Sequence, residues 1–361
     1  MEPFLIIGQD PKSHYIYGAD NATQKFQEAL DQFSTTGGWL HCKEGPLPAE
    51  IYSSLMIDSH VKVTFSPGLL IKYGNGSNYN AIFKNRTVGA TDITLEGLRI
   101  DGNREGDNPT PSVPRDMVRF LNTTDCTIRN IRVRNFPDSA VVFDGASGSH
   151  NVLEDFVIED GDDIGVYMSN TSSNTIRHGV VRRMVSYGVR NRRTTGGGLL
   201  SEIINVRTEE CGINPDPALN VAGMMVDSTE LTKVALCTSV GSGGNNYHVK
   251  AAYCLMNNNH SFNAGAHGFY INGAARGTLN GNVNHNASRL APDTYSGIFL
   301  ENVTDLGVNG NRSGDSGSGA TRQAYGLEEV GSSNNNRGTG NIFDRNGLGA
   351  VKLVGANSSI T

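Results

Sequence analysis

A short phrase recurs through most of this chain and restricts its fold more than any other feature. Each copy places a corner residue before a short strand of alternating polarity, as in residues 164–168 (Ile-Gly-Val-Tyr-Met). The corner glycines are Gly165, Gly188, Gly223, Gly268, Gly297, Gly326 and Gly349. Their spacings are 23, 35, 45, 29, 29 and 23 residues, and the longest holds one more copy, residues 246–250, with asparagine at the corner. Asparagine is a good replacement for glycine where φ is positive, so the repeat continues through this copy.

A second marker, a Gly-Asn pair, runs in the same register at residues 281–282, 310–311 and 340–341. A repeat this short, with no helical segment, excludes propeller blades, which need roughly 40 residues each. The Leu-x-x-Leu-x-Leu frame of leucine-rich repeats is also missing. Coils of three short strands fit the spacing, each stacked on the next at about 4.8 Å, and parallel crossovers favour a right-handed winding. The sequence therefore predicts an all-β fold, a right-handed parallel β-helix of three-strand coils.

The N-terminal segment differs from the repeats and has the pattern of an amphipathic helix. Its apolar stripe, at helical spacing, comprises Phe26, Ala29, Leu30 and Phe33. Asp20 and Asn21 are both candidates for the N-cap. A helix at the open end of a β-helix shields unpaired strand edges. We expect one β-helix domain over residues 1–361, with a short capping helix at about residues 18–34 and stacked coils over about residues 38–361.

Charge and hydropathy restrict the partners of the chain. A net charge of −6 and an isoelectric point of about 5.9 oppose a general nucleic-acid binder, which needs a basic surface. No apolar run approaches the roughly 20 residues of a membrane span, and the first eight residues lack the positive region of a signal peptide. The five cysteines include no Cys-x-x-Cys pair, which predicts buried free thiols instead of a disulfide framework.

Three segments resemble the pectin-lyase-like superfamily: residues 18–40, 61–63 and 93–104 (Ile-Thr-Leu-Glu-Gly-Leu-Arg-Ile-Asp-Gly-Asn-Arg). This group includes pectate lyases, polygalacturonases, alginate C5-epimerases and many phage tailspikes, and the resemblance extends over nearly the whole chain. It implies a β-helix that lays a polysaccharide along one face of its coils. The protein would be secreted or sit on a cell or virion surface, as a monomer or a homotrimer. Because the superfamily hosts several chemistries, the activity has to be argued from individual side chains.

Two rows of side chains are expected on the outer face of the corner strands, because alternate residues of a strand point to the same side. The residues two positions after each corner are Tyr167, Arg190, Met225, His248, Tyr270, Phe299 and Glu328. Those four positions after it are Ser169, Arg192, Asp227, Lys250, Asn272 and Glu301. Aromatic rings stack on sugar faces and arginine pairs with carboxylates, so this composition indicates an acidic polysaccharide as the partner.

The first hypothesis is proton abstraction beside a uronate carboxylate, which leads to β-elimination or C5-epimerisation. Such chemistry needs a cation at the carboxylate, a base at C5 and an acid, and the resemblance implies Tyr, His, Lys and Arg residues for it. The predicted catalytic set is Arg190 and Arg192 as cations, Lys250 or His248 as base, and Tyr167 or Tyr270 as acid. The predicted substrate-binding residues are Asp227, Phe299 and Glu301. The Asp-Pro-His-Glu phrase of the epimerases is absent, since the matching residues 142–146 read Val-Phe-Asp-Gly-Ala.

Two alternatives stay open. Inverting glycoside hydrolysis would use Asp138, Asp162 and Asp163, which lie in phrases similar to the Asn-Thr-Asp-Gly and Gly-Asp-Asp motifs of polygalacturonases and would place carboxylates on consecutive coils. The Gly-His-Gly motif of that family reads Ser-Tyr-Gly here, at residues 186–188. The other alternative is a non-catalytic carbohydrate-binding or structural shaft, such as a tailspike body.

An acidic run at residues 154–163 leaves calcium (Ca²⁺) open as a cofactor, because clustered carboxylate oxygens suit this ion. The acids are Glu154, Asp155, Glu159, Asp160, Asp162 and Asp163. The run has no spaced ligand motif, so solvated turns are the expected structure and no residue is predicted as a metal ligand.

Overall fold

The computed structural model describes residues 3–9, 11–18, 21–45, 47–77, 79–106, 114–193, 200–213, 221–228, 231–273, 275–315 and 323–361. The chain divides into two compact units, Met1–Gly179 and Val180–Thr361. Each unit is a stack of coils of parallel strands with the right-handed winding that the sequence predicts. A typical coil contributes one strand to a sheet that follows the corner residues, which we call the corner sheet. It contributes two further segments to a second sheet, which we call the long sheet.

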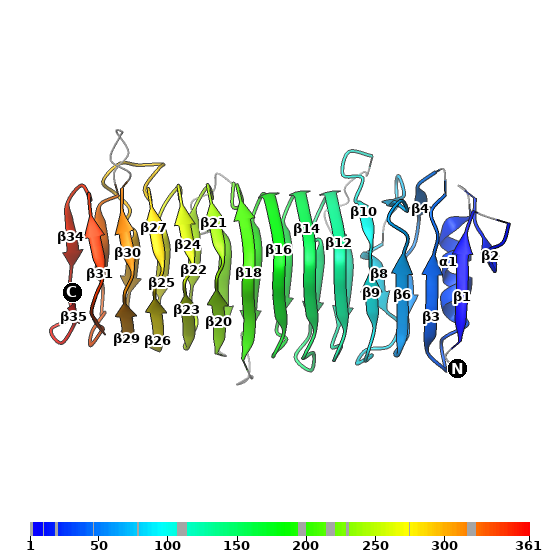
Figure 1. Ribbon diagram of the computed structural model, residues 1–361, viewed down its shortest axis with the longest axis horizontal. Helices are drawn as coiled ribbons and strands as arrows, with labels where there is room; N and C mark the ends of the chain where they lie inside the picture. The colour runs from blue at the N-terminus through cyan, green and yellow to red at the C-terminus, as the bar shows by residue number, and fades with distance from the viewer. Residues whose placement is uncertain are drawn as a thin grey trace. The chain divides into compact units, whose positions relative to one another are not determined.

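The first unit contains both sheets (Figure 1). Its corner sheet consists of β5 (Leu55–Ile57), β8 (Ala81–Asn85), β11 (Asp116–Leu121), β13 (Val141–Asp144) and β15 (Ile164–Ser169). Its long sheet contains β1 (Phe4–Gly8), β2 (Tyr15–Ile16), β3 (Gly38–Cys42), β4 (Ala49–Ile51), β6 (Val61–Phe65), β7 (Ile71–Tyr73), β9 (Thr94–Glu96), β10 (Arg99–Asp101), β12 (Thr127–Phe136) and β14 (Val152–Gly161). Strand β16 (Thr175–Met184) begins in the first unit and ends in the second.

The second unit repeats this arrangement. Its corner sheet consists of β17 (Tyr187–Arg193), β19 (Ala222–Ser228), β22 (Asn245–Val249), β25 (Phe269–Asn272), β28 (Ile298–Glu301), β31 (Tyr325–Val330) and β34 (Gly349–Lys352). Its long sheet contains β18 (Ser201–Glu209), β20 (Thr232–Ala235), β21 (Thr238–Val240), β23 (Cys254–Asn257), β24 (His260–Phe262), β26 (Ala275–Asn280), β27 (Val283–His285), β29 (Thr304–Asn309), β30 (Arg312–Gly314), β32 (Arg337–Gly338), β33 (Ile342–Asp344) and β35 (Ser359–Ile360). The strands that the repeat predicts are therefore present on the corner sheet.

A left-handed residue turns the chain between the two long-sheet segments of a coil. In one coil the segments are β9 and β10, joined at Gly97 with φ of 81°. In the next they fuse into β12, whose two halves pair with β9 and β10 and which bends at Asn130 with φ of 53°. Asp155 bends β14 in the same way, with φ of 55°. Asparagine and aspartate adopt this conformation more readily than other non-glycine residues, which explains why they occupy these turns between the long-sheet segments.

Outward side chains on the long sheet of the first unit form two rows of alternating charge. The first charge row is Glu96, Arg129, Glu154 and Arg177, with Glu96–Arg129 and Glu154–Arg177 ion pairs of 2.9 and 2.6 Å. The second charge row is Glu50, Lys72, Asp101, Arg134 and Glu159, with Glu50–Lys72 and Asp101–Arg134 ion pairs of 3.3 and 3.2 Å. Opposite charges on neighbouring strands attract and like charges repel, so the alternation favours the observed register.

A ladder of buried asparagines runs through the second unit at the Gly-Asn marker of the sequence. Its rungs are Asn259, Asn282, Asn311 and Asn341. The backbone N–H and the Nδ2 of each rung donate to the Oδ1 of the next, at 2.9–3.1 Å. The first three rungs are at most 1% exposed, so water does not compete for these hydrogen bonds and the ladder fixes the stacking of the coils.

The N-terminal helix α1 (Ala22–Asp31) caps the first coils, as the amphipathic pattern predicts. The predicted stripe is buried, with Phe26, Ala29, Leu30 and Phe33 at most 2% exposed, and the helix packs against β1, β2, β4 and β5. The side chain of Gln27 accepts from the Met56 N–H at 2.8 Å and donates to the Met56 carbonyl at 3.2 Å. These bonds satisfy the backbone of β5 at the end of the corner sheet.

The N-cap is Asn21, one of the two predicted candidates. Its Oδ1 accepts a hydrogen bond from the Gly18 N–H at 2.7 Å and none from the helix. The other candidate, Asp20, lies outside the described residues. Within the described ranges, no helix has the length and hydropathy that a membrane crossing requires.

All five cysteines are free and buried, which confirms the prediction of isolated thiols. Burial raises the pKa of the Cys211, Cys237 and Cys254 thiols to about 12. The thiolate is the reactive form of cysteine, so these side chains act as small apolar groups in the core.

Candidate functional site

The corner sheet of the second unit brings most of the predicted site residues into register. The first row, across β17, β19, β22, β25, β28 and β31, is Arg190, Met225, His248, Tyr270, Phe299 and Glu328. The second row is Arg192 on β17, Asp227 on β19, Lys250 directly after β22, Asn272 on β25 and Glu301 on β28. Neighbouring members of a row are one strand apart, about 4.8 Å.

Much of the first row is covered. His248 is 0% exposed, Met225 4% and Glu328 8%. The His248 ring stacks on Tyr270, with centroids 4.5 Å apart and planes 14° apart. A base has to reach the proton that it removes. The buried ring of His248 is therefore placed to orient Tyr270, and the exposed Lys250 is the more accessible of the two predicted bases.

His267 completes this aromatic cluster, and the sequence analysis did not single it out. Its ring stacks on Phe299 at 4.1 Å and meets Tyr295 edge-on at 5.1 Å. Burial lowers the pKa of His267 to about 3, so the ring is neutral, and its Nδ1 accepts a hydrogen bond from the Ser296 N–H at 3.0 Å. The ring helps to bury the first row and holds Phe299 half-exposed beside it.

The signal that could have identified His267 is its position directly before a corner glycine. Tyr187 and Tyr325 occupy the same position in other coils. The Arg190 guanidinium lies 4.8 Å from the Tyr187 ring centroid. Lys352 on β34 is the register partner of Glu328 and so continues the first row, and its ammonium lies 5.5 Å from the Tyr325 ring centroid. Aromatic residues before the corner therefore contact the first row, and cation–π attraction orients its basic members.

Tyr270 belongs to a polar group at the edge of the cluster. Its hydroxyl donates to the Glu301 carboxylate, and Asn272 Nδ2 donates at 2.8 Å to both the Tyr270 oxygen and Glu301 Oε2. Burial and the hydrogen bond to Glu301 raise the pKa of Tyr270 to about 12. The phenol therefore keeps its proton across the physiological pH range, which is the state that a proton donor requires.

The second row offers exposed cations. Neither Arg192 nor the Lys250 ammonium has a hydrogen bond or ion pair with a side chain in the part of the chain that the structure describes. Asp227 lies between them along the row and is half-buried. Cations without an acidic partner remain available to a carboxylate on a ligand. Lys250 directly follows β22, the strand next to that of Tyr270, and Arg192 lies two strands further along the row.

The corner sheet of the first unit holds a second titratable group. Arg119 on β11 donates to Asp116 at 3.1 Å and to Asp144 at 2.5 Å. Burial and the nearby carboxylate of Asp138 raise the pKa of Asp116 to about 8. Asp116 also occupies the position before the corner, in register above Ser139, which follows Asp138. The sequence analysis named Asp138 and missed Asp116.

The remaining predicted residues of the first unit lie on the same coils. Tyr167 is half-buried on β15, where it pairs with Val142 of β13. Asp138 accepts a hydrogen bond from the Arg115 N–H at 3.0 Å. Asp162 is exposed and forms a 2.9 Å ion pair with Arg104, and Asp163, two residues before the corner glycine, is half-buried.

The acidic run does not gather into a metal site. Within the described ranges, no group of three or more His, Cys, Asp or Glu side chains is arranged to hold a metal ion. Glu154 is paired with Arg177 at 2.6 Å and Asp155 with His178 at 3.8 Å. The strand alternation and these partners direct the carboxylates to different places.

Known proteins resemble this chain in structure but not detectably in sequence. No family model matches the sequence, and no curated protein matches it. The A-module of mannuronan C-5 epimerase AlgE6 from Azotobacter vinelandii is similar in structure, with a TM-score of 0.65, 16% identity and coverage of 94% of this chain and 93% of that one. The family 28 exopolygalacturonase of Yersinia enterocolitica is similar with a TM-score of 0.64 and 10% identity, over 99% of this chain and 79% of that one. Tailspike protein 3 of bacteriophage CBA120 is similar with a TM-score of 0.62 and 12% identity, over 94% of this chain and 58% of that one. The chain therefore shares the parallel β-helix fold of these three proteins.

Proposed function

We propose that this protein acts on a uronate-containing polysaccharide, by removing the proton at C5 beside the carboxylate, as a lyase or an epimerase. The observation that carries the proposal is the second row of the second unit, where Arg192 and Lys250 are exposed and have no acidic partner among the described residues. A polymer laid along the stacked coils would meet both side chains. Its carboxylate would supply the missing partner of Arg192 and bring the neighbouring sugar carbon to Lys250.

The roles follow from exposure and charge. Arg192 neutralises the substrate carboxylate, which stabilises the negative charge that develops when the C5 proton leaves. Lys250 is the base and acts as the neutral amine, because it is exposed while His248 is buried. Tyr270, whose pKa is raised to about 12, is the acid. Arg190, held over Tyr187, is a second cation for a neighbouring carboxylate.

Substrate binding falls to the half-buried members of both rows. Phe299 presents a ring to a sugar face, and Asp227 and Glu301 accept hydrogen bonds from sugar hydroxyls. Tyr167 belongs to the corner sheet of the first unit, so it has no role in the site proposed on the second unit. The partner is an acidic polysaccharide, so we place the protein outside the cell or on a cell or virion surface, as a monomer or a homotrimer; sedimentation of the purified protein distinguishes these two states.

Turnover of polygalacturonate and polymannuronate tests the proposal. Elimination creates unsaturated sugars that absorb in the near ultraviolet, and epimerisation is read by proton NMR. Lys250→Gln and Tyr270→Phe should each lower kcat by about 100-fold or more, the usual contribution of a positioned acid or base. Lys233→Gln is the matched control, since Lys233 is paired with Glu202 on the long sheet at 2.9 Å. Full turnover by Lys250→Gln would contradict the proposal.

Inverting hydrolysis is the second candidate, and the carboxyls of Asp116 and Asp138 favour it. Burial and the nearby Asp138 carboxylate raise the pKa of Asp116 to about 8, so carboxyls of neighbouring coils lie close enough to influence each other, as the acid and base of such an enzyme must. Asp138, Asp162 and Asp163 would supply the base and the acid, because Asp116 is buried and cannot reach a glycosidic oxygen. New reducing ends without ultraviolet absorbance, lost in Asp138→Asn, would support it. Binding without any product would leave the non-catalytic shaft.

A further inference from the structure

Two arginines on the long sheet of the first unit break the alternation of charge. Arg99 on β10 and Arg132 on β12 are register partners, and both are exposed. Neither guanidinium group forms a hydrogen bond or an ion pair within the part of the chain that the structure describes. The arginines of both charge rows on β12, in contrast, are paired with carboxylates.

Arg99 and Arg132 define a third row of outward side chains, in which two positive charges lie opposite each other. Like charges directly opposite on neighbouring strands destabilise a sheet. The next strand of the row carries Val157, the register partner of Arg132, and Leu70 lies just before β7, which pairs with β10. The row therefore contains no acid, although the two charge rows that flank it alternate in sign.

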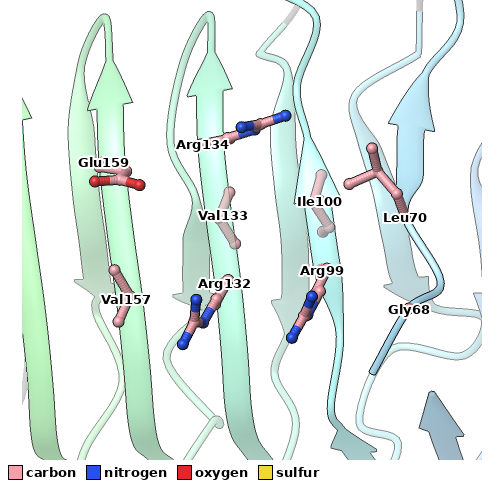
Figure 2. Close-up of a pocket in the computed structure, with 9 residues that line it drawn as sticks. All are labelled: Gly68, Leu70, Arg99, Ile100, Arg132, Val133, Arg134, Val157 and Glu159. Atoms are coloured by element: carbon pink, nitrogen blue, oxygen red, sulfur yellow. The ribbon is translucent and has the colours of Figure 1, made fainter. Parts of the chain in front are cut away.

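A hollow of about 310 Å³ opens over the same residues. Figure 2 shows the Arg99 and Arg132 guanidinium groups side by side on neighbouring strands, pointing the same way, with Leu70 and Val157 on either side of them. The lining acid is Glu159, which belongs to the second charge row as the register partner of Arg134. The hollow thus offers two unsatisfied cations between two apolar side chains.

We propose that Arg99 and Arg132 form a binding subsite for one carboxylate of an acidic polysaccharide, on a different sheet from the two rows of the candidate active site. Guanidinium groups about one strand spacing apart can both donate to a single carboxylate. Leu70 and Val157 contact the sugar that carries it. The inference rests on the proposed function for the identity of the polymer, and the subsite holds the polymer without transforming it, which raises its local concentration.

Isothermal titration calorimetry with trigalacturonate and trimannuronate tests the subsite. The background is Arg192→Gln/Lys250→Gln, which removes the exposed cations of the second row. In that background, adding Arg99→Gln/Arg132→Gln should weaken binding by at least about tenfold, the contribution of a charge-assisted contact. Arg134→Gln, which removes an equal charge that is already paired with Asp101, is the control and should change the affinity less than about twofold.

Four results decide the outcome. Unchanged affinity in the Arg99/Arg132 variant, an equal loss in Arg134→Gln, equal binding of neutral maltotriose, or no binding of either acidic trimer would each refute the subsite. Thermal melting controls for folding, and the variant should melt no lower than its parent because a repulsion is removed. In an otherwise unaltered chain, the variant should keep kcat and raise KM for the long polymer. Turnover by Lys250→Gln alone tests the proposed function, so the subsite can stand when that function fails.

Discussion

Replacing Asn282 with alanine should destabilise the second unit by about 3–5 kcal/mol. Its Oδ1 accepts from the Asn259 N–H and Nδ2, both at 3.0 Å, and its Nδ2 donates to the Met256 carbonyl at 2.9 Å. The substitution leaves the Asn259 N–H, the Asn259 Nδ2 and the Met256 carbonyl without this partner. Each unsatisfied buried group costs about 1–3 kcal/mol before relaxation. The Oδ1 of Asn311 still accepts from the residue-282 backbone N–H at 2.9 Å, so the lost side-chain bond to Asn311 adds little to the destabilisation.

Thermal unfolding followed by far-ultraviolet circular dichroism measures this effect. A unit of this size loses roughly 2–4 °C of Tm per kcal/mol, so Tm should fall by about 10 °C. Asn341→Ala is the matched control, because the last rung is partly exposed and water can replace its bonds at a cost of about 1 kcal/mol. A shift within about 2 °C for Asn282→Ala, or an equal shift for the control, would refute the reasoning.

Three further predictions concern titration and thiols. Burial lowers the pKa of His267 to about 3 from its ordinary 6.5. The unfolded chain therefore binds more protons between these values, and the free energy of unfolding should fall as the pH drops from 6.5 to 3; His267→Phe should reduce that fall in urea titrations. Asp116 has a pKa of about 8 against 3.8, so the folded chain binds more protons in this range and its contribution should weaken as the pH rises from 4 to 8; Asp116→Asn should flatten that slope. An aromatic disulfide reagent should modify none of the five buried thiols before unfolding and all five afterwards, with Tm unchanged by a reductant.

The sequence contained enough to predict the winding of the chain. The expectation of positive φ at the corner residues is wrong, since none of them adopts it. Close packing restricts these positions instead: a Cβ at Gly188 would lie 2.6 Å from the Gly223 carbonyl oxygen, and the same restriction repeats with the coil. The Gly-Asn marker likewise indicates the asparagine ladder, because a side-chain amide both donates and accepts along the stack. Alternation within each strand then placed Lys250 and Tyr270 on one outer face, and the register of the second unit agrees.

Exposure within that face was beyond sequence reasoning. Alternation states which side a residue points to, but the segments before the corners decide what covers it. His267 and Tyr295 pack against Phe299, and the first row is largely buried, although both rows looked equally open in the sequence. Asp116 was missed for the same reason, since its raised pKa comes from burial and from Asp138 one coil away.

The charge rows of the first unit also limit how such a stack can change its length. If the single coil that contains Glu154 were removed, Arg129 would lie beside Arg177, a residue of like charge, in the first charge row. In the second charge row, Arg134 would lose its acidic neighbour Glu159. Loss or duplication of two adjacent coils leaves the order of signs intact. For this surface the natural increment of growth is a pair of coils, so an ancestral chain that lengthened by tandem duplication would have done so in steps of about twice the sequence repeat.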